Sequence, residues 1–66
     1  MSKLKSLRDR FNMTQLDVSM QSGVNIDTIR KWETGINDIR NANVSNVKAV
    51  ADVFGVSIEE LITDDE

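Results

Sequence analysis

The stretch MTQLDVSMQSGVNIDTIRKWETG, residues 13–35, decides how this chain folds. Its pattern predicts one short helix, a tight turn at Gly23, where a positive φ angle is unstrained only for glycine, and a second short helix. Thr14 is a favourable N-cap for the first of these helices, and Asp17, three residues later, complements the exposed amide groups of its first turn. Asn25 is expected to cap the second helix. The remaining segments must supply the core on which this pair of helices rests.

The second helix of the pair, expected to run to about Thr34 and to end at Gly35, has two distinct faces. At 100° per residue, Ile29 and Trp32 face the core and Glu33 lies beside them. The opposite face and its flanks carry Asp27, Arg30, Lys31, Thr34, Ile26 and Thr28. Two cations and short polar groups on a helix just beyond a tight bend suit a groove. An ordinary solvated helix face has the same composition, so the pattern alone leaves both interpretations open.

The first helix of the pair also has two kinds of face. Val18, Ser19 and Ser22 share one side, where their small size permits close packing of a neighbouring helix. Leu16 and Met20 fall on the other side. There they are either surface hydrophobic residues covering the preceding helix or, less favoured, a contact for a partner protein.

The segment before this stretch predicts an amphipathic helix over residues 3–11. Leu4, Leu7 and Phe11 lie at helical spacing and are expected to form its buried stripe. Asn12 is expected to end this helix, because asparagine tolerates the left-handed conformation at a helix terminus.

Beyond residue 35 the chain predicts a loop over residues 36–42, with Ile36 and Ile39 holding the loop to the core. A fourth helix follows, capped by Asn43 and ended by Gly55. Its expected buried stripe is Val44, Val47, Val50, Ala51 and Phe54.

A last short helix is predicted by a capping box formed by Ser57 and Glu60. Its apolar side is Ile58, Leu61 and Ile62. Residues 63–66 form an acidic tail that should fray. The predicted fold is therefore all-α, with five helices in one compact domain over residues 1–66.

The composition excludes several classes of function. The chain has 66 residues, enough for one domain, and contains neither cysteine nor histidine. It therefore lacks disulfides, thiolate metal ligands and the commonest general base. We expect no metal, no cofactor and no enzymatic activity. Because no apolar run of about eighteen residues and no signal-peptide pattern is present, we also expect a soluble cytoplasmic protein that does not enter a membrane.

The formal net charge of −3 argues at first sight against a nucleic-acid partner, but the charges are unevenly distributed. Residues 1–50 contain all eight basic residues beside five acidic ones, a net charge of +3. Residues 51–66 contain six acidic residues and no basic one. This acidic end is either a solvated terminus that aids solubility or the negative end of a dipole that turns the basic side toward a polyanion.

A set of spaced residues carries a resemblance to a known family: Thr14, Gln15, Val18, Ser19, Gly23, Val24, Ile29, Trp32, Glu33 and Gly35. They resemble the helix-turn-helix of the phage repressor and Cro class, also called the XRE family. The closing AVADVFGVSIEEL, residues 49–61, is similar to the fourth and fifth helices of that family. The resemblance extends over residues 4–62 and implies a lambda-repressor-like domain, from a bacterium or phage, in which residues 14–34 form the helix-turn-helix.

The resemblance also implies roles for individual residues. It places contacts with double-stranded DNA at Thr14, Gln15, Asn25, Ile26, Asp27, Thr28, Arg30, Lys31, Thr34, Asn37 and Arg40. Gln15 would hold a backbone phosphate, and Lys31 with the two residues that open the third helix would contact base edges. Arg8 and Glu33 match a largely buried ion pair of the family, which favours a structural interpretation of Glu33.

The chain departs from the family at three positions of this motif. Ser19 replaces a small alanine, which is a mild change. Ile26 and Asp27 replace the glutamine- or serine-rich opening of the reading helix. Ile26 would suit a thymine methyl group, whereas Asp27 either accepts a hydrogen bond from cytosine N4 or serves only the helix dipole. These departures affect the expected target sequence and leave the fold unchanged.

The resemblance predicts a sequence-specific DNA-binding transcriptional regulator, with repression favoured over activation. Two copies would place their third helices about 34 Å apart in the major groove of an operator. The candidate dimer surface consists of Ala49, Val53, Ile58 and Ile62.

Other functions fit the same fold. An antitoxin of a toxin–antitoxin pair and a controller protein of a restriction system are alternatives within the DNA-binding class. A protein-interaction module without specific DNA binding is an alternative from another class. The net charge of −3 and the pair Leu16 and Met20 support this last alternative.

Overall fold

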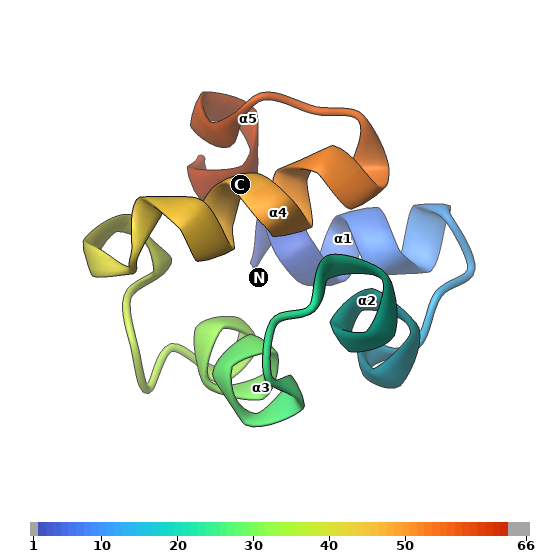
Figure 1. Cartoon of the computed structure of the whole chain (residues 1–66), viewed down its shortest axis with the longest axis horizontal. Helices are drawn as coiled ribbons and strands as arrows, with labels where there is room; N and C mark the ends of the chain where they lie inside the picture. Colours follow the sequence, from blue (N-terminus) through green and yellow to red (C-terminus); the bar gives the residue numbers. More distant parts are fainter. Residues whose placement is uncertain (1, 64–66) are drawn as a thin grey trace.

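The computed structural model describes residues 2–63 and contains five α-helices in that range, which confirms the predicted all-α class (Figure 1). The helices are α1 (Lys3–Arg10), α2 (Gln15–Ser22), α3 (Ile26–Thr34), α4 (Val44–Phe54) and α5 (Ile58–Ile62), with a short 3-10 helix, η1 (Ile39–Asn41), between α3 and α4. Thr63 is the C-cap of α5, and the rest of the tail that was expected to fray lies outside the described residues.

The helices pack around one core. α2 contacts α3 and α4, α1 contacts α3 and α5, and α4 contacts α5, while α3 and α5 lie on opposite sides of the molecule (Figure 1). The buried side chains come from all five α-helices and from the turn after α2: Leu4, Leu7, Val18, Val24, Ile29, Trp32, Val47, Val50, Ala51, Phe54 and Leu61. The α2–α3 pair therefore rests on a core supplied by the three other helices.

Local sequence determines where the helices begin and end. Thr14 and Asp17 form a full capping box, in which each backbone N–H donates to the other residue's side chain, at 2.9 and 3.0 Å. Asn12 adopts a positive φ of 56° after α1, as predicted. At the start of α5, the Ser57 hydroxyl accepts a hydrogen bond from the backbone N–H of Glu60, which is one half of the predicted box.

Three side chains that were predicted to be buried in a helix stripe or to hold a loop to the core are exposed. Ile36 is 71% exposed and Val44 68% exposed, and Phe11, the C-cap of α1, is about half exposed. Val44 lies in the first turn of α4, one turn before Val47, the first buried residue of that helix. Spacing determines the side of a helix on which a residue lies, but burial also needs a neighbouring element opposite it. Phe11 finds a partial partner, since its ring packs edge-on against Phe54 with centroids 5.4 Å apart.

The segment after α3 is more ordered than the predicted loop. Ile39 packs against the core, as predicted, but it does so from the 3-10 helix η1. Asp38 caps η1 by accepting a hydrogen bond from the backbone N–H of Arg40 at 2.9 Å. Aspartate is a favoured N-cap residue, so Asp38 was a signal in the sequence that a helical turn could begin after it.

Replacement of Gly23 tests the turn between α2 and α3. Gly23 has a φ of 77°, and Gly23→Ala is expected to lower the free energy of unfolding by about 1–2 kcal/mol, since L-residues are strained there. An added Cβ would meet no heavy atom within 4 Å, so the loss comes from the backbone and not from a clash. Gly23→Asn should lose less, because asparagine tolerates this region. Urea unfolding followed by Trp32 fluorescence measures both variants, and equal losses would contradict the explanation.

The capping box of α2 should make stability depend on acid pH. Hydrogen bonds from the backbone N–H and then the hydroxyl of Thr14 lower the pKa of Asp17 below its ordinary value of 3.8. A carboxylate whose pKa is lower in the folded state stabilises the fold above the unfolded pKa, and this contribution is lost as the pH falls through the folded pKa. We therefore expect Asp17→Asn to destabilise the protein at neutral pH and to show a weaker further loss below pH 3.8 than the wild type. Thermal unfolding between neutral and acid pH measures the difference, and parallel profiles for the two proteins would contradict it.

Candidate nucleic-acid interface

Side-chain hydrogen bonds fix the turn between α2 and α3. The Ser19 hydroxyl donates to the carbonyl oxygen of Val24 at 2.6 Å, and the Val24 N–H donates to the Ser22 hydroxyl at 3.1 Å. Val24 itself is buried in the core. The sequence marked both serines only as small residues for packing. In the structure they also satisfy two backbone groups of the turn, the carbonyl oxygen and the N–H of Val24.

A bidentate ion pair joins the N-terminal helix to α3. The Nε and Nη2 of Arg8 donate to the two carboxylate oxygens of Glu33 at 2.6 and 2.8 Å. Their side chains are only 12% and 5% exposed. The hydrogen bond to Glu33 raises the pKa of Arg8 against the opposing effect of burial. The third guanidinium nitrogen, Nη1, donates to the carbonyl oxygen of Met13 at 3.0 Å and so also holds the segment that precedes α2.

Gln15 belongs to the same network. Its Nε2 donates to Oε1 of Glu33 at 3.1 Å, so the first residue of α2 is tied to α3 through the carboxylate. This bond uses one amide hydrogen, and within residues 2–63 the Gln15 side chain has no other hydrogen bond. The second amide hydrogen and the amide oxygen remain available beside the N-terminus of α2. The sequence singled out Gln15 and Glu33 separately and did not indicate that they touch.

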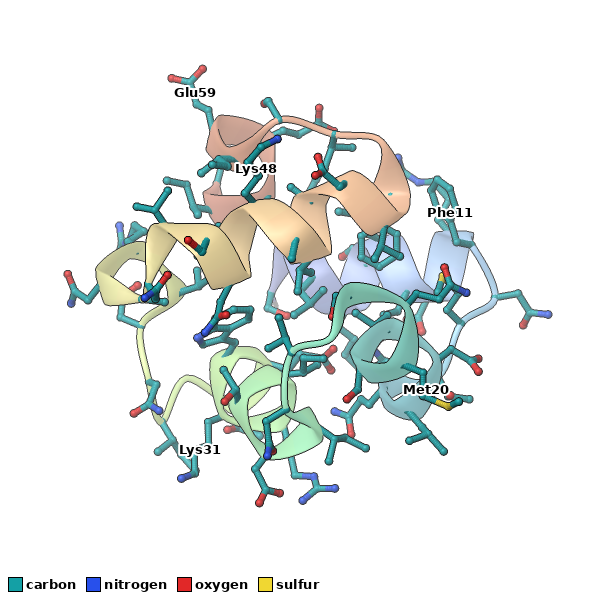
Figure 2. The ribbon with its side chains drawn as sticks, in the orientation of Figure 1. Phe11, Met20, Lys31, Lys48 and Glu59 are labelled. Carbon is teal, nitrogen blue, oxygen red and sulfur yellow. The ribbon has the colours of Figure 1, made fainter. Side chains whose placement is uncertain are left out.

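The outward side of α3 is arranged as the 100° spacing predicted. Asp27, Arg30, Lys31 and Thr34 are exposed, whereas Ile26 and Thr28 are half buried. Figure 2 shows Lys31 projecting from the outer side of α3, away from the other helices. Arg30 donates from Nη1 to Oδ1 of Asp27 at 2.9 Å, and Lys31 has no ion-pair partner within residues 2–63. Asn25 caps the helix by accepting from the N–H of Asp27.

The segment beyond α3 holds its polar groups in local bonds. The Thr34 hydroxyl donates to the backbone carbonyl oxygens of Arg30 and Lys31 at 3.1 and 3.3 Å. Arg40 donates from Nε and Nη2 to both carboxylate oxygens of Asp38, at 3.1 and 3.0 Å. These hydrogen bonds with Arg40 lower the pKa of Asp38. The sequence did not select Asp38, although its carboxylate neutralises the one cation that was expected to meet the DNA backbone in this loop.

A polar hollow of about 390 Å³ lies between α3, the following loop and the start of α4. Trp32 and Ile36 contribute apolar surface, and polar residues surround them: Thr28, Asn37, Asp38, Asn41, Asn43 and Asn46. Of these, the sequence had selected Thr28 and Asn37. The hollow extends the polar surface of α3 toward the N-terminus of α4.

The acidic residues of α5 lie on the opposite side of the molecule from α3 (Figure 1). Between residues 51 and 63 the charged residues are Asp52, Glu59 and Glu60, all acidic. Figure 2 shows Glu59 on the opposite side of the molecule from Lys31. In the part of the chain that the structure describes, no helix is long and apolar enough to cross a membrane. No group of three or more acidic, cysteine or histidine side chains within those residues is placed to hold a metal ion.

Comparison with known proteins agrees with this geometry. A family model described as helix-turn-helix matches residues 4–61. The chain is similar to the HTH-type transcriptional activator BcrR of Enterococcus faecalis, with 34% identity over 64 residues. That match covers 97% of this chain but only 30% of the relative, so the chain spans less than a third of the relative's length. No solved structure gives a significant match.

Removal of one member of the buried ion pair tests its structural role. Glu33→Ala is expected to lower the free energy of unfolding by about 3–5 kcal/mol, because it leaves a buried guanidinium without its carboxylate. The double variant Arg8→Met, Glu33→Leu should be more stable than Glu33→Ala, since both charges are replaced by apolar groups of similar volume. Urea unfolding measures both.

The exposed pair Lys5–Asp9 in α1 provides the control for this comparison. Asp9→Ala removes a carboxylate from a solvated partner and should change stability little. A Glu33→Ala variant that loses no more stability than Asp9→Ala would contradict the role given to the buried pair.

Proposed function

This chain belongs to the XRE-type helix-turn-helix family, and on that basis we propose that it is a sequence-specific double-stranded DNA-binding transcriptional regulator. The observation that carries the proposal is the division of α3 into two faces. Ile29 and Trp32 hold one side against the core, while the other presents Arg30 and Lys31 to solvent. A helix that is fixed from behind and polar in front can enter the major groove without rearrangement.

The backbone contact that fits the geometry best is at Gln15. One of its amide hydrogens is bound to Glu33, which orients the amide while the second hydrogen remains able to donate to a phosphate oxygen. The free N–H groups at the start of α2 lie beside it, and helix N-termini favour anions. Thr14 and Asn25 precede the two helices of the motif, and Asn37 and Arg40 follow α3, so these residues complete the contact surface.

Dimerisation would supply affinity that one copy lacks. Lys31 is the cation of α3 without an ion-pair partner among the described residues, so a single domain neutralises few phosphates. The described part of the molecule measures 23 × 22 × 21 Å, and α3 lies at its edge. Two adjacent copies of this size are compatible with half-sites about 34 Å apart. The four residues of the candidate dimer surface, Ala49, Val53, Ile58 and Ile62, are half buried and pack against the core, which leaves part of each side chain for a partner.

Repression is the regulatory outcome that we propose. A protein bound across a promoter excludes other proteins by occupancy alone, whereas activation requires a further productive contact. The relative in Enterococcus faecalis is named an activator, so the sign of regulation needs a direct measurement. A reporter gene is placed under the control of the DNA upstream of the protein's own gene. Its expression should fall when the protein is supplied, and an increase in expression would show activation instead.

Two substitutions separate base contact from phosphate contact. Lys31→Ala should weaken binding to the DNA upstream of the protein's own gene more than binding to unrelated DNA, because it removes a contact with a base edge. Gln15→Ala should weaken specific and unrelated DNA by the same factor, since a phosphate contact carries no base information. Fluorescence anisotropy with both duplexes, between about 50 and 200 mM salt, measures these changes.

Lys48→Ala is the matched control, because it also removes one positive charge. Lys48 lies on α4, on the other side of the molecule from Lys31 (Figure 2), and pairs with Asp52. Equal weakening by Lys48→Ala and Lys31→Ala would contradict the assignment of α3 to the interface. If the wild type shows no preference for any fragment, the protein-interaction alternative replaces this proposal. The exposed Leu16 and Met20 on α2, with Met20 75% exposed, would then be the first surface to test.

A further inference from the structure

Asp27 and Arg30 form an ion pair on the face of α3 that we assign to DNA. The two side chains are three residues apart on the helix, and Nη1 of Arg30 lies 2.9 Å from Oδ1 of Asp27. Both remain in solvent, with 54% of the arginine and 67% of the aspartate side chain exposed. The pair is therefore accessible to a ligand as it stands, and neither residue contributes to the core.

Arg30 uses Nη1 for this pair, which leaves the edge of its guanidinium group formed by Nε and Nη2 open. Nε and Nη2 share one edge of the planar group and form its two-pronged donor. Arg8 shows this mode in the same protein, where Nε and Nη2 hold both oxygens of Glu33. Arg30 has only Nη1 bound, so within residues 2–63 its Nε and Nη2 have no partner.

The other arginine expected at the interface is differently placed. Arg40 already donates from Nε and Nη2 to Asp38, so its two-pronged edge is occupied by its own neighbour. Lys31 has a single ammonium group, which acts as a point charge and cannot present a planar fork. Of the cations on α3 and η1, Arg30 is the one whose fork is both exposed and open in the described structure.

We propose that Asp27 and Arg30 act as one unit that recognises a guanine in the major groove, which rests on the DNA-binding function proposed above. The Nε and Nη2 of Arg30 donate to N7 and O6 of the guanine, the commonest specific contact between an arginine and a base. Asp27 touches no base. It is a positioning residue that holds Nη1, and this restraint reduces the side-chain freedom that Arg30 loses on binding.

This role for Asp27 differs from both roles considered from the sequence, cytosine contact and dipole stabilisation alone. It also explains how a carboxylate is tolerated close to DNA phosphates. The negative charge of Asp27 is matched by Arg30, so the unit as a whole is neutral. A neutral unit adds base preference without adding much salt-dependent affinity.

The test begins with selection from DNA. Wild-type protein is incubated with duplexes that carry a randomised central segment, and the bound fraction is sequenced. The selected sites should contain a G·C base pair at one fixed position. On individual duplexes, Arg30→Ala should reduce the preference for that base pair by about 5- to 150-fold, the value of one bidentate contact. Arg30→Lys, which keeps the charge but not the fork, should reduce it similarly.

Asp27→Ala tests the positioning role. It should weaken the preference at the same base pair while raising affinity for unrelated DNA, because a negative charge is removed near the phosphates. In the Arg30→Ala background, Asp27→Ala should cause no further change in that preference, since the carboxylate acts only through the arginine. A purely structural effect of Asp27→Ala would change binding to all sequences equally and would not alter the base preference.

Asp52→Ala is the matched control, since it removes an aspartate from another exposed pair within a helix, Lys48–Asp52 on α4. It should leave every base preference unchanged. The inference would be overturned if the protein selects a defined site but keeps its base preferences in Arg30→Ala. It would also be overturned if Asp27→Ala changes the base preference in the absence of Arg30. Either result would leave the proposed function intact. If wild-type protein selects no sequence, the proposed function fails and the inference fails with it.

Discussion

The bidentate ion pair between Arg8 and Glu33 is the interaction on which the rest of the structure depends. Its two partners are 25 residues apart in sequence, and their side chains are largely buried, so the two charges neutralise one another away from bulk water. Through Nη1 and the Gln15 amide the same network also reaches the start of α2. One largely buried group of charged and polar side chains thus orients three helices. A domain of this size gains little excess stability from apolar burial alone, so such a network matters more here than in a larger domain.

This arrangement separates the side of α3 that supports the fold from the side that we propose contacts DNA. Behind α3, the side chains of Ile29 and Trp32 fill the core, and Glu33 carries the ion pair. In front, the exposed residues of α3 that the structure describes make local contacts, such as that between Asp27 and Arg30. Changes on the front face should therefore cost little stability and, under the proposed function, alter the preferred DNA sequence, whereas changes behind it should affect the fold first.

The local pairing of charges also explains why the net charge of −3 describes this molecule poorly. Four exposed ion pairs neutralise cations within one turn of the chain: Lys5–Asp9, Arg30–Asp27, Arg40–Asp38 and Lys48–Asp52. On the surface that we propose contacts DNA, the pairs of Arg30 and Arg40 should leave only a modest attraction for phosphates. If the proposed function holds, discrimination between sequences depends on hydrogen-bond geometry in the groove more than on long-range electrostatics.

The sequence by itself determined the five α-helices, their caps and the turn between α2 and α3. Thr14 with Asp17, Asn12 and Gly23 act through backbone groups within a few residues, so their effect does not depend on distant parts of the chain. The resemblance to a known family indicated the pairing of Arg8 with Glu33, but not the bond from Gln15 that completes the network. The ion pair of Asp27 and Arg30 has the spacing of helix neighbours, so it was open to prediction and was missed.

Only the tertiary structure decided which of the apolar side chains predicted to be buried are in fact buried. Val44 satisfies the spacing for burial and is exposed, and Ile36, which was expected to hold its loop to the core, is exposed as well. Periodicity gives the direction in which a side chain points. Whether another element meets it there, and which polar atoms come together as a result, depends on contacts between residues far apart in the chain.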